Sequence, residues 1–171
     1  MTEAERIEMP RREPGGGPCV ILGYDRGESA RHAASWATSE LMSSGKLVIV
    51  HACRPLHTLP VPPRTPGEHH QLERALLDEL MLDGDERLFD VDFAIEVSDE
   101  DPVTALIDAA RDHRARAIVI GARHHSRLFE ALGTTTGELL RTSPVAVITV
   151  PLSAVSGRAP TPSTVAGRAP S

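Results

Sequence analysis

This chain of 171 residues has few aromatic side chains, which make up 3% of it, and almost no lysine. Because hydrophobic residues still make up 40% of the chain, aliphatic side chains must fill its core. Lys46 is the only lysine among the 18 basic residues, and the rest are arginine, which cannot form a Schiff base. The composition therefore argues against lysine-based covalent catalysis and against a P-loop, which needs a lysine in its G-K-[ST] sequence.

Cysteine is also sparse, and basic residues are not in excess. Cys19 and Cys53 do not form a C-x-x-C pair, so their spacing excludes a redox dithiol and a zinc ribbon. Both lie in or beside apolar runs, where cysteine behaves as a small hydrophobic residue. The formal net charge of −6 argues against a nucleic-acid partner.

Long apolar runs are missing too. The longest run is far shorter than the ~20 residues that a membrane-spanning helix needs. The first 18 residues lack the apolar stretch of a secretory signal. We therefore expect a cytoplasmic protein without a membrane-spanning segment.

The two ends of the chain differ in composition from its middle. Residues 1–18 are charged and rich in glycine and proline, and residues 152–171 contain the sequence G-R-A-P twice. Low-complexity segments of this kind are typical of disordered tails. We expect one folded domain, over residues 19–151.

Within that domain, short aliphatic runs alternate with segments of helical periodicity. The apolar runs predict strands at 19–22, 47–50, 91–97, 117–120 and 145–150. The strand at 91–97 has one polar face, which indicates an edge. Helices are expected over 28–43, from about 72 to 84, from Asp101-Pro102 onward, and from a capping box at Thr135 to Thr142, whereas the five prolines of 54–67 predict a segment without regular structure.

This alternation predicts an α/β fold. Strands joined through helices pair in parallel through right-handed crossovers. The fold expected is a single doubly wound five-stranded parallel sheet with helices on both faces. Ligands of such folds bind at the carboxyl ends of the strands, which here are residues 23–27, 51–54 and 121–136.

One of these ends has the features of an anion site. Gly133 and three following threonines precede a helix, whose N-terminus offers unpaired N–H groups and a positive dipole. Gly121 would let a ligand approach the end of its strand, and Arg123 and Arg127 could bond to phosphate. The alternative is ordinary helix capping and a glycine of the kind that commonly follows a parallel strand.

Several of these segments together are similar to one known family. The matching features are the Asp25 turn, the strand ending Val-His51-Ala, the Asp101-Pro102 helix start and, above all, Ile118-Val-Ile-Gly121-Ala-Arg, Gly133-Thr and Leu-Leu-Arg-Thr-Ser-Pro144-Val-Ala-Val-Ile-Thr-Val150. In these features residues 19–151 resemble a universal stress protein (UspA-like) domain, whose fold is of the adenine nucleotide alpha hydrolase-like, Rossmann-like type.

The resemblance implies a stress-response binding and signalling module. The nucleotide-binding branch of that family carries G-x2-G-x9-G-[ST], which wraps the phosphates of ATP, with Mg as an accompanying ion. An acidic residue after the first strand meets the ribose, and backbone of the second strand meets adenine. By position, the implied cofactor-binding residues are Asp25 for ribose, Leu47 for adenine, and Gly121, His124, Gly133, Thr134 and Thr135 around the phosphates.

The sequence departs from that pattern at two points. His124 stands where the pattern has its second glycine, and eight residues rather than nine separate it from Gly133. A histidine adds a bulky side chain where bare backbone would meet phosphate. Two hypotheses therefore remain: a module that binds ATP through an altered loop, and a dimeric interaction protein of the same fold that binds no nucleotide.

Enzyme chemistry and a metal site find little support in the residues. No G-x-S-x-G elbow surrounds any serine, and the pairs His69-His70 and His124-His125 lack the spacing of metal ligands. We expect no catalytic residues and, at most, very slow ATP hydrolysis. Because the family commonly pairs through its last strand, and an apolar strand edge needs cover, we also expect a homodimer through 145–150.

Overall fold

The computed structural model describes residues 17–41, 45–54, 62–83, 88, 90–122 and 134–152. Both expected tails, apart from residues 17, 18 and 152, lie outside these ranges. So does the segment 123–133, which carries His124 and Gly133.

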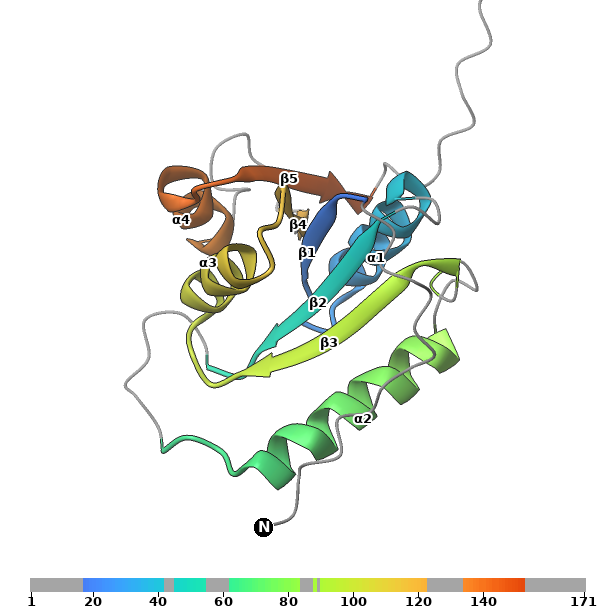
Figure 1. The fold of residues 1–171 in the computed structure, drawn as a ribbon, viewed down its shortest axis with the longest axis vertical. Coiled ribbons are helices and arrows are strands. Elements are labelled where there is room, and N and C mark those ends of the chain that lie inside the picture. The colour runs from blue at the N-terminus through green and yellow to red at the C-terminus, as the bar shows by residue number, and fades with distance from the viewer. Residues whose placement is uncertain are drawn as a thin grey trace, which may run out of the picture.

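In the described part of the chain, five strands form one parallel sheet in the order β3-β2-β1-β4-β5 (Figure 1). Their bounds are β1 Cys19–Gly23, β2 Lys46–Ala52, β3 Asp92–Ser98, β4 Ala117–Ala122 and β5 Ala146–Pro151. The chain adds β2 and β3 on one side of β1, and then β4 and β5 on the other. The point where this direction reverses lies between β1 and β4, so the prediction of a doubly wound sheet is confirmed.

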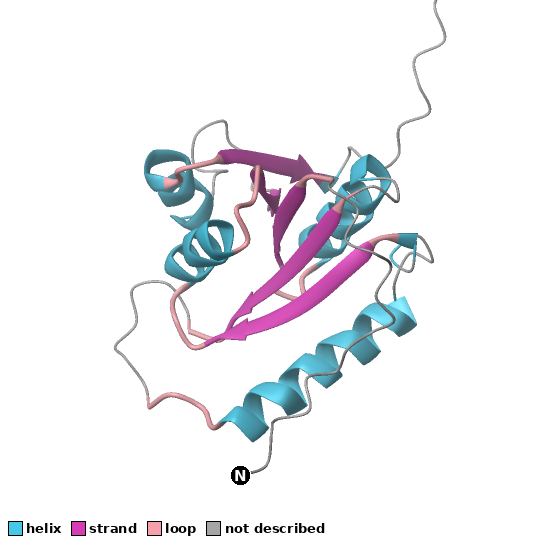
Figure 2. Cartoon of the chain, in the orientation of Figure 1, coloured by secondary structure: helices cyan, strands magenta, loops and turns pink. Residues whose placement is uncertain are grey.

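Four helices in the described ranges cover the two faces of the sheet (Figure 2). They are α1 Glu28–Leu41, α2 Pro66–Asp83, α3 Pro102–Asp112 and α4 Thr134–Thr142. Residues of α1 and α2 pack into one core cluster, and residues of α3 and α4 pack into the other. None of these helices is both long and apolar enough to cross a membrane.

Alternation along the strands divides the core between the two faces. In β1, Ile21 belongs to the α3 side and Leu22 to the α1 side, and both are fully buried. On α1, the small side chains of Ala30, Ala33 and Ala37 face the sheet and are buried. Such a helix can approach the strands closely, which suits a core almost without aromatic rings.

The predicted start of α3 is confirmed. Asp101 is the N-cap, and its Oδ1 accepts hydrogen bonds of 3.1 Å from the amides of both Val103 and Thr104. Pro102 occupies the first helical position, where its missing N–H leaves no bond unmade.

The start of α2 differs from the prediction. The helix begins at Pro66 and not near Leu72, because Thr65 and Glu68 form a reciprocal capping box. The Thr65 amide donates to Glu68 Oε2 at 2.7 Å, and the Glu68 amide donates to Thr65 Oγ1 at 3.3 Å. The helix α4 also begins earlier than expected, at Thr134, so Thr135 lies within its first turn and is not its cap.

Candidate functional site

The carboxyl ends of the strands meet at one edge of the sheet, here called the carboxyl edge. Gly23 of β1 lies beside Val50 of β2 and Ile120 of β4. The turn after β1 therefore lies next to Gly121, at the point where the winding direction reverses. Two of the predicted site residues, Asp25 and Gly121, are brought to this place.

Asp25 lies in the turn between β1 and α1, residues 24–27, here called the β1–α1 turn. Its Oδ1 accepts a 2.9 Å hydrogen bond from the Gly27 amide, which fixes the carboxylate at the start of α1. The Asp25 residue is exposed. A carboxylate held in this way can accept hydrogen bonds from the hydroxyl groups of a ligand.

The same turn contains an unusual backbone conformation. Arg26 has φ 66°, in the left-handed region that non-glycine residues enter at an energetic cost. Arg31 of α1 donates from Nη2 to the Arg26 carbonyl at 3.3 Å. Such a conformation persists where the surroundings hold it in place.

Strand β2 holds the turn from its other side. The Tyr24 amide donates to the Val50 carbonyl at 2.9 Å. His51 Nδ1 lies 2.8 Å from the Tyr24 carbonyl oxygen, which can only accept, so this ring nitrogen carries the proton. Both contacts join the turn to the end of β2.

Helix α2 reaches the turn with a carboxylate. Arg26 Nε donates to Glu79 Oε2 at 2.6 Å, and the Tyr24 hydroxyl donates to Glu79 Oε1 at 3.3 Å. Tyr24 itself is buried in the cluster that includes Leu76 and Leu80 of α2. The β1–α1 turn is thus anchored by β2, α1 and α2 together.

Gly121 has a packing role that the sequence did not predict. A Cβ atom at this position would overlap the Ser29 carbonyl oxygen and lie 2.8 Å from the Ala30 nitrogen. The space beside Gly121 is therefore filled by the backbone of α1, in the direction where we expected it to admit a ligand. Its place at the carboxyl edge remains compatible with a neighbouring ligand.

Leu47, the expected adenine contact, lies away from this site. It lies at the starting end of β2, paired with Val20 and Phe93, and it is fully buried in the core. The residues of β2 that do reach the carboxyl edge are His51 and Ala52. The position implied by the family resemblance is therefore at the opposite end of the strand from the carboxyl edge.

The phosphate candidates are only partly described. His124 and Gly133 lie outside the described residues, as do Arg123 and Arg127. Thr134 is the first residue of α4, so the N-terminus of that helix follows the 123–133 segment directly. Thr135 is half-buried in the first turn.

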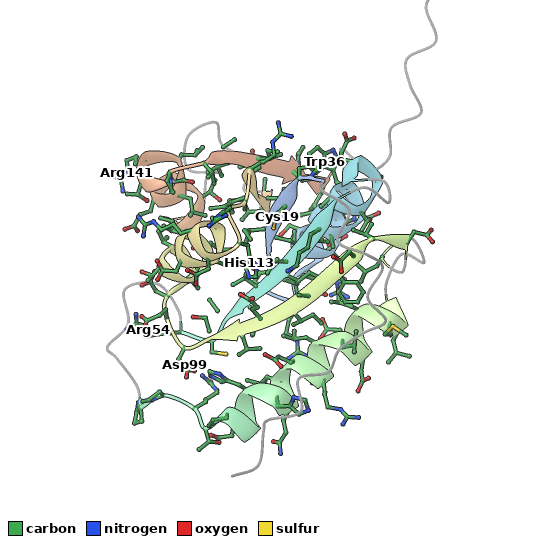
Figure 3. The ribbon with its side chains drawn as sticks, in the orientation of Figure 1. Cys19, Trp36, Arg54, Asp99, His113 and Arg141 are labelled. Atoms are coloured by element: carbon green, nitrogen blue, oxygen red, sulfur yellow. The ribbon has the colours of Figure 1, made fainter. Side chains whose placement is uncertain are left out.

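A second polar cluster at the carboxyl edge was missed from the sequence. Asp99, after β3, accepts hydrogen bonds from the Arg64 amide at 2.7 Å and from the Arg64 guanidinium, and His69 Nε2 lies 2.9 Å from it. The Arg64 amide, together with the Arg64 and His69 side chains, lowers the pKa of Asp99 to about 2. Arg54 and Asp99 lie at the same end of the sheet (Figure 3). Arg54 Nη2 donates to Glu100 at 3.1 Å and to Asp101 at 3.3 Å.

In the segment 99–101, the predicted helix start at Asp101 is confirmed, since Asp101 is the N-cap of α3. Asp99 is different, because it ties the segment before α2 to the end of β3. Its partners are 35 and 30 residues away in sequence, so no local pattern could indicate them.

The two cysteines show no sign of activation. Burial raises the pKa of both the Cys19 thiol and the Cys53 thiol, and neither forms a disulfide. A raised pKa lowers the thiolate fraction and so the reactivity. Among the described residues, no three His, Cys, Asp or Glu side chains cluster as metal ligands would.

Comparison with known proteins adds family information to this geometry. The Usp model, described as the universal stress protein family, matches residues 20–151. No curated protein matches the chain.

Solved structures of low sequence identity share the fold. Universal stress protein UspA from Lactobacillus plantarum is 20% identical, with a TM-score of 0.55, and the match covers 78% of this chain and 97% of that one. A universal stress protein in complex with cAMP is 23% identical, with a TM-score of 0.56 and coverage of 80% and 98%. A universal stress protein family protein from Arabidopsis thaliana with AMP bound is 14% identical, with a TM-score of 0.50 and coverage of 78% and 90%.

Proposed function

This chain belongs to the universal stress protein family, and we propose that it is a stress-response module that binds an adenine nucleotide at the carboxyl edge, between β1 and β4. ATP, with Mg, is the form we propose first. The observation that carries the proposal is the anchored β1–α1 turn, which holds the Asp25 carboxylate beside the end of β4 at the reversal point of the sheet. Two structures of the same fold are described as holding cAMP and AMP, which supports an adenine nucleotide as the ligand class.

Each part of a nucleotide has a suitable neighbour at this edge. The Asp25 carboxylate suits ribose hydroxyls, which donate to it. The N-terminus of α4 suits phosphates, because its first N–H groups lack partners within the helix and its dipole is positive there. For the base, the end of β2 at His51 and Ala52 replaces Leu47.

The proposal is one of binding rather than catalysis. A nucleotide at this edge would touch the β1–α1 turn and the start of α4 together, and so favour one arrangement of the two. Binding that favours one conformation shifts the population toward it. We expect turnover of ATP to be very slow, since Asp25 is the one acidic group of the turn and would be occupied by ribose.

Calorimetric titration of the purified protein with ATP and Mg tests this function, after its co-purified small molecules have been examined for nucleotide. We expect binding in the micromolar range. Asp25→Asn should keep the bond to the Gly27 amide but lose the charge, whereas Asp25→Ala loses both. We expect weaker binding in Asp25→Asn and still weaker binding in Asp25→Ala.

Asp108→Asn is the matched control, because Asp108 is an exposed carboxylate on α3 that pairs with Arg111. It should bind as the unaltered protein does. No heat and no carried-over nucleotide, in protein shown to be folded, would contradict the proposal. The second hypothesis, a dimeric interaction protein of the same fold, would then take its place.

A further inference from the structure

The contact between α2 and the β1–α1 turn joins residues that are far apart in sequence. Glu79 lies 53 residues after Arg26 and 55 after Tyr24. Its two carboxylate oxygens are divided between them, one on the Arg26 guanidinium and one on the Tyr24 hydroxyl. The Glu79 side chain is 19% exposed and that of Arg26 is 47% exposed, so the ion pair is partly screened from water.

These two partners stand on either side of Asp25. Tyr24 precedes it and Arg26 follows it, so Glu79 holds the residues that flank the carboxylate of the proposed ribose contact. Arg26 is also the residue with φ 66°. A non-glycine residue in that region needs external contacts to hold it, and the Glu79 carboxylate supplies one from outside the turn.

Helix α2 is itself fixed at a second point. Asp99 binds the Arg64 amide and His69, which lie just before α2 and in its first turn. Leu76 and Leu80 anchor the helix in the core. Glu79 therefore extends from a helix that is held both at its start and along its buried face.

From this arrangement we infer that Glu79 is a positioning residue for the nucleotide site: through Arg26 and Tyr24 it sets the turn that carries Asp25, and it couples that turn to α2. The inference rests on the proposed function for the identity of the ligand. By the reciprocity of linked equilibria, a ligand that fixes Asp25 should also strengthen the contact of Arg26 with Glu79. Helix α2 is then the element that responds when the site is filled.

Four variants test the inference by calorimetric titration with ATP and Mg. Glu79→Gln removes the negative charge that faces the Arg26 guanidinium. Arg26→Gly removes the guanidinium and relieves the left-handed backbone at the same time. We expect each to weaken binding about fivefold, the effect of losing one partly exposed ion pair.

The double variant Glu79→Gln/Arg26→Gly should be no weaker than either single variant, because both remove the same interaction. Asp78→Asn is the matched control, since Asp78 is the exposed carboxylate next to Glu79 on α2, and it should bind as the unaltered protein does. All titrations are run well below the thermal midpoint of every variant, so that a general loss of stability does not mimic the effect. The inference would be overturned if the losses of affinity in the two single variants added up in the double variant. It would also be overturned if Glu79→Gln bound ATP as tightly as Asp78→Asn.

A second measurement separates this inference from the proposed function. The Gly27 amide donates to Asp25, and its hydrogen exchange can be followed by NMR without any nucleotide. We expect faster exchange in Glu79→Gln than in Asp78→Asn. If the unaltered protein binds no nucleotide, the proposed function fails, while faster exchange would still support Glu79 as the residue that sets the turn. Unchanged exchange would contradict that role whatever the nucleotide result.

Discussion

At the scale of single residues, the clearest contrast is between two glycines. Gly121 packs against the backbone of α1, where a Cβ atom has no room, whereas a Cβ atom on Gly137 in α4 would meet nothing within 4 Å. Neither glycine adopts a positive φ. The space around each position, and not its backbone angle, therefore decides what a methyl group would do there.

We expect Gly121→Ala to lower the free energy of unfolding by about 2 kcal/mol, the usual cost of overpacking a site that the backbone encloses. Gly137→Ala is the matched control, and it should raise that free energy by up to about 1 kcal/mol, because alanine favours a helix interior more than glycine does. Urea denaturation of the two variants measures both. Equal stability of the two would show that α1 moves away without cost.

Asp99 gives a prediction on pH. The Arg64 amide, the Arg64 guanidinium and His69 lower its pKa from 3.8 to about 2. A carboxyl group whose pKa is lower in the folded state stabilises the fold at pH values above its pKa in the unfolded state. This contribution disappears as the pH falls through its pKa in the folded state. Asp99→Asn should therefore be less stable than the unaltered protein above pH 3.8. The difference in the free energy of unfolding between the two proteins should become smaller toward pH 2.

Urea midpoints recorded for both proteins between about pH 5 and pH 2 check this window. The Asn side chain keeps the shape of Asp99 but only one of its two acceptor oxygens, so the loss of charge is identified by the pH dependence of the difference and not by its size. If the difference in stability between the two proteins stays constant over the whole range, Arg64 and His69 do not stabilise the charged form of Asp99.

Individual site residues were predictable only where the information was local. The position of Asp25 in the turn after β1 was predictable, since a polar turn follows an apolar run there, whereas its contact with ribose stays a prediction. Leu47 was carried over by position from the family resemblance, which did not fix where along β2 the carboxyl edge lies. The partnership of Arg26 with Glu79 has no local signal at all, because it depends on how α2 crosses the sheet.

At the scale of elements, the starts of the helices are set by single side chains. The start of α3 was predictable because Asp101-Pro102 stands directly before a clear apolar stripe. The start of α2 was missed, although Thr65, Pro66 and Glu68 are an equally good signal, because the surrounding prolines indicated an irregular segment. A capping box outweighs nearby prolines when one of them occupies the first helical position.

Asp101→Ala should lower the free energy of unfolding by about 1 kcal/mol, the ordinary cost of a lost N-cap. Asp101→Asn should lose much less, because the amide oxygen of asparagine can accept from the same two backbone N–H groups. Thermal or urea denaturation distinguishes the two variants. Similar losses in both would assign the effect to the charge that faces Arg54 and not to capping.

At the scale of the whole molecule, the sheet ends on one side at β5, which pairs only with β4 among the described strands. The fold class, the strand positions and the edge position of β3 were all predictable from periodicity, because each is a property of runs of residues. Association between copies was also expected from the apolar edge at 145–150, and it remains a prediction.

We expect light scattering at micromolar concentration to give the mass of a dimer, held through β5. Ala146 is exposed at the start of that strand, and Ala146→Lys should shift the protein toward the monomer, because an edge lysine opposes strand pairing. Leu82→Lys is the control, since Leu82 is 87% exposed on α2 and should leave the mass unchanged. A stable monomer in the unaltered protein would contradict the prediction.

The close packing of Gly121 against α1 also bears on how related sequences are interpreted. A sequence of this fold that keeps α1 in the same place is favoured to keep a glycine at 121, whether or not it binds a ligand. Natural selection on the fold alone would preserve the first glycine of the G-x2-G-x9-G-[ST] pattern. A glycine at this position is therefore explained by packing alone and is not by itself evidence of nucleotide binding.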